Sequence, residues 1–153
     1  MPTIELTTCI FAPIEKCFDV ARNIDLHKES MGHSGEEAIA GVTSGLIGFG
    51  EEVTWRAKHL GFTMTLSSRI TAYQFPVHFR DEMIKGPFKM ICHDHIFRAK
   101  GNATIMEDKF CYESPLGVLG NIFNRLYLNN YLKRLLLQRN RAIKIYAEKL
   151  QDG

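Results

Sequence analysis

The last forty or so residues carry one long helical repeat, and this feature restricts the possible folds more than any other. Ser114 and Pro115 are typical of a helix N-terminus. A helix over most of 116–150 would be about 50 Å long at ~1.5 Å per residue, so in a chain of 153 residues it must lie across a whole sheet. Apolar residues recur at helical spacing, at 119, 122, 123, 126, 132, 135, 136, 143, 146, 147 and 150.

The residues before this helix alternate between apolar and polar side chains, a period typical of β-strands. Turns that contain Gly or Pro separate the alternating segments, so consecutive strands should be antiparallel neighbours. After the first strand, Pro13 and Glu15 favour a helix that ends near Arg22, and a second short helix is expected over 26–31. The predicted strands are 2–11, 37–43, 50–59, 62–74, 77–85, 88–99 and 103–113.

This order of elements predicts one α+β domain over 1–153 with the helix-grip fold. In that fold, a seven-stranded antiparallel sheet wraps around a long C-terminal helix, with two short helices after the first strand. Hydrophobic residues make up 45% of the chain and charged residues 24%, the balance of a globular protein. A net charge of +2 without a Lys/Arg run argues against a nucleic-acid partner.

Targeting signals and cysteine spacing predict the compartment. Residues 1–12 lack a signal-peptide pattern, and no run approaches ~18 apolar residues, so we expect a cytoplasmic protein. The four cysteines show no C-x-x-C spacing, which favours free thiols. The end of the chain is basic, which is compatible with an anionic membrane surface but more often means a solvated helix face. From residue 115 onward two acidic residues stand against seven basic ones, predicted on the outer face of the helix: Arg125, Lys133, Arg134, Arg139, Arg141, Lys144 and Lys149.

Five short motifs are similar to those of a known superfamily. They are F-x-D at 79–81, G-P-F at 86–88, H-x-H-x-F at 93–97, T-x-M-x-D at 104–108 and Y-x-x-P-x-G at 112–117. The chain resembles the START-like (SRPBCC) superfamily, which includes the major birch-pollen allergen, polyketide cyclases and coenzyme Q-binding proteins. It most resembles a bacterial ligand-binding subgroup loosely labelled cell-division-inhibitor-like. The resemblance implies a curved sheet that grips the long helix, with an apolar cavity between them.

Hairpin turns predict which residues lie opposite each other in the sheet. A two-residue turn at Gly101-Asn102 pairs Cys92 with Cys111 on one face and, on the other, His95 with Asp108, Phe97 with Met106, and His93 with Phe110. A turn at Gly86-Pro87 pairs Phe79 with His93 and Asp81 with Ile91, so that Asp81 lies diagonally within reach of His93. Because buried charges must be paired, we expect contacts of His95 with Asp108 and of Asp81 with His93.

The face that carries these histidines is mostly apolar and aromatic, so it should face the helix and bind a ligand. We expect a small, largely apolar ligand: a lipid, polyketide, quinone or aromatic compound. Trp55 is the only tryptophan, and its strand phase points it to the same face. The predicted ligand-binding residues are Trp55, Phe79, Asp81, Met83, His93, His95, Phe97, Met106, Asp108 and Phe110.

Other functions remain open for the same residues. A His–Asp pair suits acid/base catalysis in a cyclase or hydratase, and two imidazoles with a carboxylate suit a transition metal. A membrane-associated interaction protein that uses the basic helix is a further alternative. Since His–Asp pairs commonly satisfy buried imidazoles, the ligand-orienting role is favoured, and no metal, cofactor or catalytic residue is predicted. The remaining histidines are expected in solvated positions: His27, His33, His59 and His78.

Overall fold

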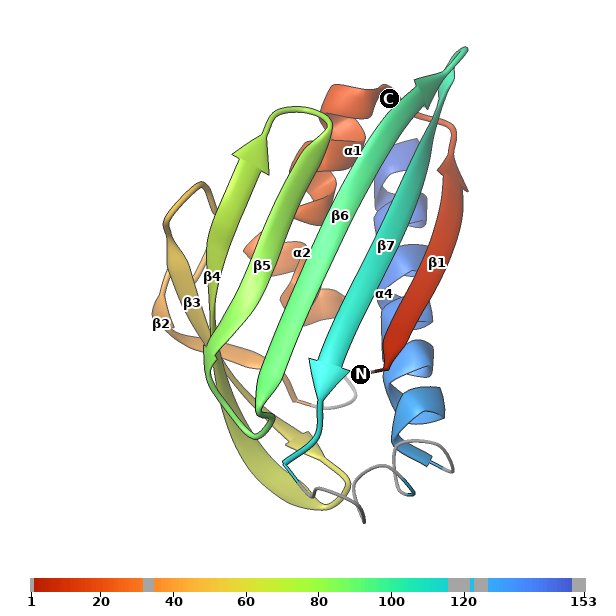
Figure 1. Ribbon diagram of the computed structural model, residues 1–153. Coiled ribbons are helices and arrows are strands. Elements are labelled where there is room, and N and C mark those ends of the chain that lie inside the picture. The colour runs from red at the N-terminus through yellow and green to blue at the C-terminus, as the bar shows by residue number, and fades with distance from the viewer. Residues whose placement is uncertain (1, 32–34, 116–121, 123–126, 150–153) are drawn as a thin grey trace.

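The computed structural model describes residues 2–31, 35–115, 122 and 127–149. Its strands form one antiparallel sheet in the order β1-β7-β6-β5-β4-β3-β2, and the described helices cover one face of it (Figure 1). This arrangement confirms the predicted helix-grip fold. The strands are β1 (Thr3–Ile10), β2 (Glu37–Gly41), β3 (Glu52–His59), β4 (Phe62–Gln74), β5 (His78–Lys85), β6 (Met90–Lys100) and β7 (Ala103–Glu113); the helices are α1 (Ile14–Ala21), α2 (Ile24–Ser30) and α4 (Asn129–Lys149).

Helix α4 is 21 residues long and runs along the sheet (Figure 1). Segments 116–121 and 123–126 of the predicted helix, and its last residue 150, lie outside the described residues. The buried positions of α4 follow helical spacing and include two polar residues: Leu136, Arg139, Asn140, Ile143 and Ala147. The helix therefore brings polar side chains, as well as apolar ones, to the sheet.

The β6–β7 hairpin has the predicted register. Gly101 has a φ of 60°, in the left-handed region that favours glycine, and Lys100 lies opposite Ala103. Every pair predicted from this turn is present, including His95 with Asp108 and His93 with Phe110. Cys92 lies opposite Cys111, and both are free thiols. A two-residue turn leaves one way to align its strands, which is why this prediction succeeds.

The β5–β6 register differs from the prediction by two residues. Phe79 lies opposite His95, and Asp81 lies directly opposite His93. The connection runs over 86–89 and is longer than a two-residue turn, so Gly86-Pro87 does not set the alignment. Because the shift is an even number of residues, every side chain keeps its predicted face.

Two apolar clusters flank the middle of the sheet. The first packs around Phe18 of α1, whose ring lies 5.2 Å from that of Phe79 and 5.4 Å from that of Phe97. The second joins Ile91 and Phe110 of the sheet to Leu136 of α4. The polar residues of β5, β6 and β7 lie among these clusters, so their charges depend on one another for stabilisation.

Candidate functional site

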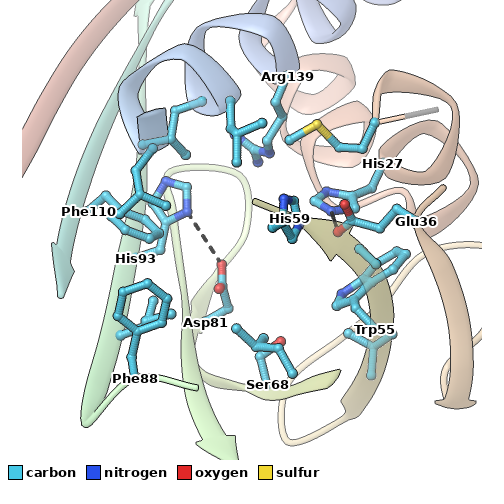
Figure 2. Close-up of a pocket in the computed structure, with 18 of the residues that line it drawn as sticks. His27, Glu36, Trp55, His59, Ser68, Asp81, Phe88, His93, Phe110 and Arg139 are labelled. Carbon is cyan, nitrogen blue, oxygen red and sulfur yellow. Dashed lines mark hydrogen bonds and ion pairs between the residues drawn. The ribbon is translucent and has the colours of Figure 1, made fainter. Parts of the chain in front are cut away.

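A pocket of about 370 Å³ lies between the sheet and helices α2 and α4 (Figure 2). Its wall is mainly apolar and includes two groups of polar side chains. Met64, Leu66, Ser68 and Ile70 of β4 all line it, as expected for alternate residues of one strand. The wall also includes six of the ten residues predicted to bind a ligand: Trp55, Phe79, Asp81, His93, His95 and Phe110.

The other four predicted residues do not line the pocket. Phe97 and Met106 are buried in the cluster around Phe18, because α1 packs over that end of the sheet. Met83 packs against the second apolar cluster. Asp108 has no exposed side-chain surface and lies behind His93. Period-two alternation identifies the inward face, but it does not tell which part of that face α1 covers.

The histidines and aspartates hydrogen-bond in a crossed pattern that differs from the prediction. His93 Nε2 lies 2.8 Å from Asp108 Oδ1, and His95 Nε2 lies 2.7 Å from Asp81 Oδ2. The expected partners are farther apart, with 3.6 Å between His95 Nδ1 and Asp108 Oδ1 and 3.9 Å between His93 Nδ1 and Asp81 Oδ2. Diagonal Cβ atoms are separated by about 7 Å, and this span suits the long reach of an imidazole Nε2 better than the ~5 Å between opposed residues.

Arg139 of α4 lies at the centre of this cluster. Its Nη2 donates to His95 Nδ1 at 3.1 Å, and its Nη1 lies 3.5 Å from Asp108 Oδ1. Asn140 supports the same carboxylate, because its Nδ2 donates to Asp108 Oδ2 at 2.7 Å and its Oδ1 accepts from Arg139 at 3.0 Å. Neither residue was predicted to belong to the site, and the prediction of Arg139 on the outer face of the helix is wrong. Their helical spacing from Leu136 and Ile143 was the available signal.

The contact with Arg139 fixes the protonation of His95. A guanidinium can only donate, so His95 Nδ1 accepts, the ring is neutral, and its proton lies on Nε2. Nε2–H therefore donates to Asp81. Burial, together with the nearby charges of His93 and Arg139, lowers the pKa of His95 to about 3. His95 thus acts as a neutral donor to Asp81 at neutral pH.

Both aspartates are ionised at neutral pH. Burial would raise the pKa of Asp81, but the hydrogen bond from His95 and the nearby charges of His93 and Arg139 outweigh it and lower the pKa to about 2. Burial likewise opposes ionisation of Asp108, yet the hydrogen bond from His93 and the charge of Arg139 hold its pKa far below the usual range. Among Arg139, Asp81 and Asp108, one positive charge therefore stands against two negative ones.

Solved structures of other proteins share this architecture. The Zhui aromatase/cyclase from Streptomyces sp. R1128 has a TM-score of 0.72 at 14% identity, covering 97% of this chain and 94% of that one. A START superfamily protein from Mycobacterium smegmatis has a TM-score of 0.72 at 13% identity, covering 97% and 98%. Ginseng major latex-like protein 151 from Panax ginseng has a TM-score of 0.69 at 18% identity, covering 95% and 97%. The protein has the START-like, helix-grip fold. No protein-family model and no curated protein sequence matches the chain.

The pocket has a second group of polar side chains, near Trp55, that was not predicted from the sequence. His27 Nε2 lies 3.0 Å from Glu36 Oε1, and its ring lies 4.4 Å from that of Trp55. His59 Nδ1 lies 2.7 Å from the hydroxyl of Tyr131. Both histidines line the pocket and are not simply solvated. His59 continues the inward phase of Val53, Trp55 and Ala57, and this alternation was the signal to follow.

The chain has two further histidines, His33 and His78. His78 lies on the outer face of the sheet and hydrogen-bonds Asp94 at 2.7 Å, whereas His33 lies outside the described residues. Among the helices that the structure describes, none has the length and apolar character to span a membrane.

One grouping resembles a metal site. Donor atoms of Asp81, His93 and His95 all lie within 4.8 Å of one another. However, both ring nitrogens of His95 already have partners, since one accepts from Arg139 and the other donates to Asp81. A metal on Nε2 would displace that proton beside a fixed cation, which is unfavourable. The contacts therefore favour a hydrogen-bonded cluster that orients Asp81.

Proposed function

We propose that this protein binds a small, largely apolar ligand in the pocket between the sheet and α4. The pocket itself carries the proposal, because its volume of about 370 Å³ and its mainly apolar wall suit a ligand of that class. A few polar side chains at fixed positions would orient the ligand. The ligand-binding residues are those of the wall, including Asp81, His93 and His95 of the polar cluster and Trp55 on the other side of the pocket.

Native mass spectrometry of protein purified from its own host tests this proposal. The expected result is a small organic molecule that is retained by the folded protein and released on unfolding. Ser68→Leu should lower its occupancy, because Ser68 is buried in the pocket wall and a larger side chain would fill the space. Ser67→Leu is the matched control, since Ser67 is not in the wall and bonds Thr54 instead. Equal occupancy in both variants would contradict the proposal.

A second candidate function is acid/base catalysis, favoured by the contacts of His93. Its Nε2 is bonded to Asp108, and Nδ1 lies on the side of Asp81 and the pocket (Figure 2). A His held in this way by a carboxylate can move a proton to or from a bound substrate. The pair is His93–Asp108, in place of the His95–Asp108 pair expected from the sequence.

Hydration of an enone such as cyclohexenone tests this second candidate. Removal of a general base lowers a rate by about a hundredfold or more, so His93→Gln should abolish most of the activity. Glu107→Gln, on the same strand as Asp108 and in an outward ion pair with Arg98, should retain it. A wild-type rate equal to that of buffer would exclude this reaction.

We also propose a cytoplasmic setting for the protein. All four cysteines are free thiols. Even Cys92 and Cys111, which lie opposite each other, form no disulfide, as suits a reducing compartment. Cell fractionation with an antibody to the chain tests this, and recovery outside the cytoplasm would contradict it.

A further inference from the structure

The carboxylate of Asp81 has unused hydrogen-bonding capacity. Its side chain keeps 27% of its surface exposed and belongs to the pocket wall, whereas Asp108 is fully covered. The contacts to Asp81 all involve Oδ2, which accepts from His95 at 2.7 Å and lies 3.9 Å from His93 Nδ1. Within the part of the chain that the structure describes, Oδ1 has no hydrogen-bond partner. An ionised carboxylate oxygen is therefore left for a group on the ligand.

The two arginines of the pocket wall, Arg22 and Arg139, already have partners within the protein. Arg139 donates to His95, Asn140 and the carbonyl of Ala21, and pairs with Asp108. Arg22 pairs with Asp19 and donates to the carbonyl of Ile47. Because no other Lys or Arg lines the pocket among the described residues, an anionic ligand group would meet Asp81 without a free cation to bind it. The part of the pocket around Asp81 therefore disfavours carboxylates and phosphates.

The charge of the cluster favours a cation over a neutral donor. Asp108 is compensated by Arg139, Asn140 and His93, all of which contact it directly. Asp81 instead accepts from the neutral ring of His95 and, among the described residues, contacts no Lys or Arg directly, so its negative charge is offset only by His93 at 3.9 Å and by the more distant Arg139. A positive group on the ligand would complete the pairing in a partly desolvated site.

Aromatic side chains lie on two sides of this carboxylate. Figure 2 shows Asp81 in the middle of the pocket, with Phe88 and Phe110 on one side and Trp55 on the other. Ring faces attract a neighbouring cation and pack against flat apolar groups. From these observations we infer that the ligand is an amine: an aromatic or apolar body with a protonated nitrogen that binds Asp81. This inference rests on the proposed ligand-binding function and narrows its ligand class.

Calorimetric titration with three probes of one skeleton tests the inference: naphthylmethylamine, naphthylmethanol and naphthoate. Wild-type protein should bind the amine about tenfold or more tightly than the alcohol, since hydrogen bonds to charged groups contribute about 1.5 to 3 kcal/mol. The carboxylate should bind most weakly. Asp81→Asn should remove the preference for the amine while leaving the affinity for the alcohol within about threefold. Asp94→Asn is the matched control, because Asp94 lies on the outer face of β6 with Arg80 and His78.

The possible outcomes separate this inference from the proposed function. Binding of the alcohol without any preference for the amine would overturn the inference and leave ligand binding intact. Tighter binding of the carboxylate would overturn it as well. If none of the probes binds, both the inference and the proposed function are contradicted for aromatic ligands. The wild-type rank order decides the matter even if Asp81→Asn fails to fold.

Discussion

Arg139 Nη2 lies 3.1 Å from His95 Nδ1, and this contact joins helix α4 to the middle of the sheet. Since the guanidinium always donates, the neutral imidazole of His95 can pass one hydrogen bond onward, from Nε2 to Asp81. A residue of the helix thereby fixes the orientation of a carboxylate on β5. The charge at the pocket surface is set by a contact between elements that are far apart in sequence.

The first prediction concerns stability against pH. Because the pKa of His95 is about 3 in the folded state and near 6.5 in the unfolded state, the unfolded chain binds an extra proton between these values. The resulting stability is present above pH 6.5 and is lost as the pH falls toward 3. His95→Gln can keep both hydrogen bonds without titrating.

Urea unfolding at pH 7 and pH 5 measures this difference. From pH 7 to pH 5 the wild type should lose about 2 kcal/mol more unfolding free energy than His95→Gln. Equal losses in the two proteins would show that the pKa of His95 is not lowered by folding, so that its ring is protonated at pH 5 in the folded state. That result would contradict the contact with Arg139 as described.

Removal of Arg139 should be strongly destabilising. Arg139→Met leaves the ionised Asp108 buried with fewer partners, and breaking a buried ion pair typically costs about 3 to 5 kcal/mol. Arg134→Met is the control on the same helix, because Arg134 is exposed and should change stability by less than ~0.5 kcal/mol. Denaturant unfolding of both variants checks the prediction, and similar losses would refute it.

Core and pocket residues should have separable effects on stability and on ligand binding. Met106→Ala should lower stability by about 2 to 5 kcal/mol, because Met106 is fully buried in the cluster around Phe18. It should leave naphthylmethylamine affinity unchanged, since Met106 does not line the pocket. Phe88→Ala should lower the affinity for naphthylmethylamine and change stability less than Met106→Ala, because Phe88 is a half-buried wall residue. Thermal unfolding measures the stability of both variants, and calorimetry measures their affinity. A changed affinity in Met106→Ala would show that the pocket boundary is wrong.

Two glycines with similar backbone angles should differ in their tolerance of a methyl group. Gly41 has a φ of 74°, and a Cβ there would collide with the carbonyl of Glu52 on the paired strand β3. Gly45 has a φ of 75° but open space around it. Gly45→Ala should cost about 1 to 2 kcal/mol for the left-handed backbone alone, and Gly41→Ala roughly 3 kcal/mol or more. Unfolding free energies of the two variants measure both costs. Equal costs would show that the structure places β2 incorrectly against β3.

Local rules account for the elements that were predicted correctly. Alternation with period two identified the strands and the inward face, and the two-residue turn at Gly101 determined the β6–β7 register. The longer connection over 86–89 carried no such restriction, so the β5–β6 register was two residues in error. Because an error of two residues leaves each side chain on its predicted face, Asp81, His93 and His95 were still predicted on one face.

Periodicity and turns within a few residues were enough to predict the fold, the inward face of the sheet and the residues that could meet on that face. Three features depend instead on contacts between distant elements: which His hydrogen-bonds which Asp, where α1 covers the core, and the inward orientation of Arg139. A charged residue at a helical core position is stabilised there only when partners on other elements neutralise it. For Arg139 that partner is Asp108, 31 residues away in the chain, and helical periodicity contains no information about such a contact.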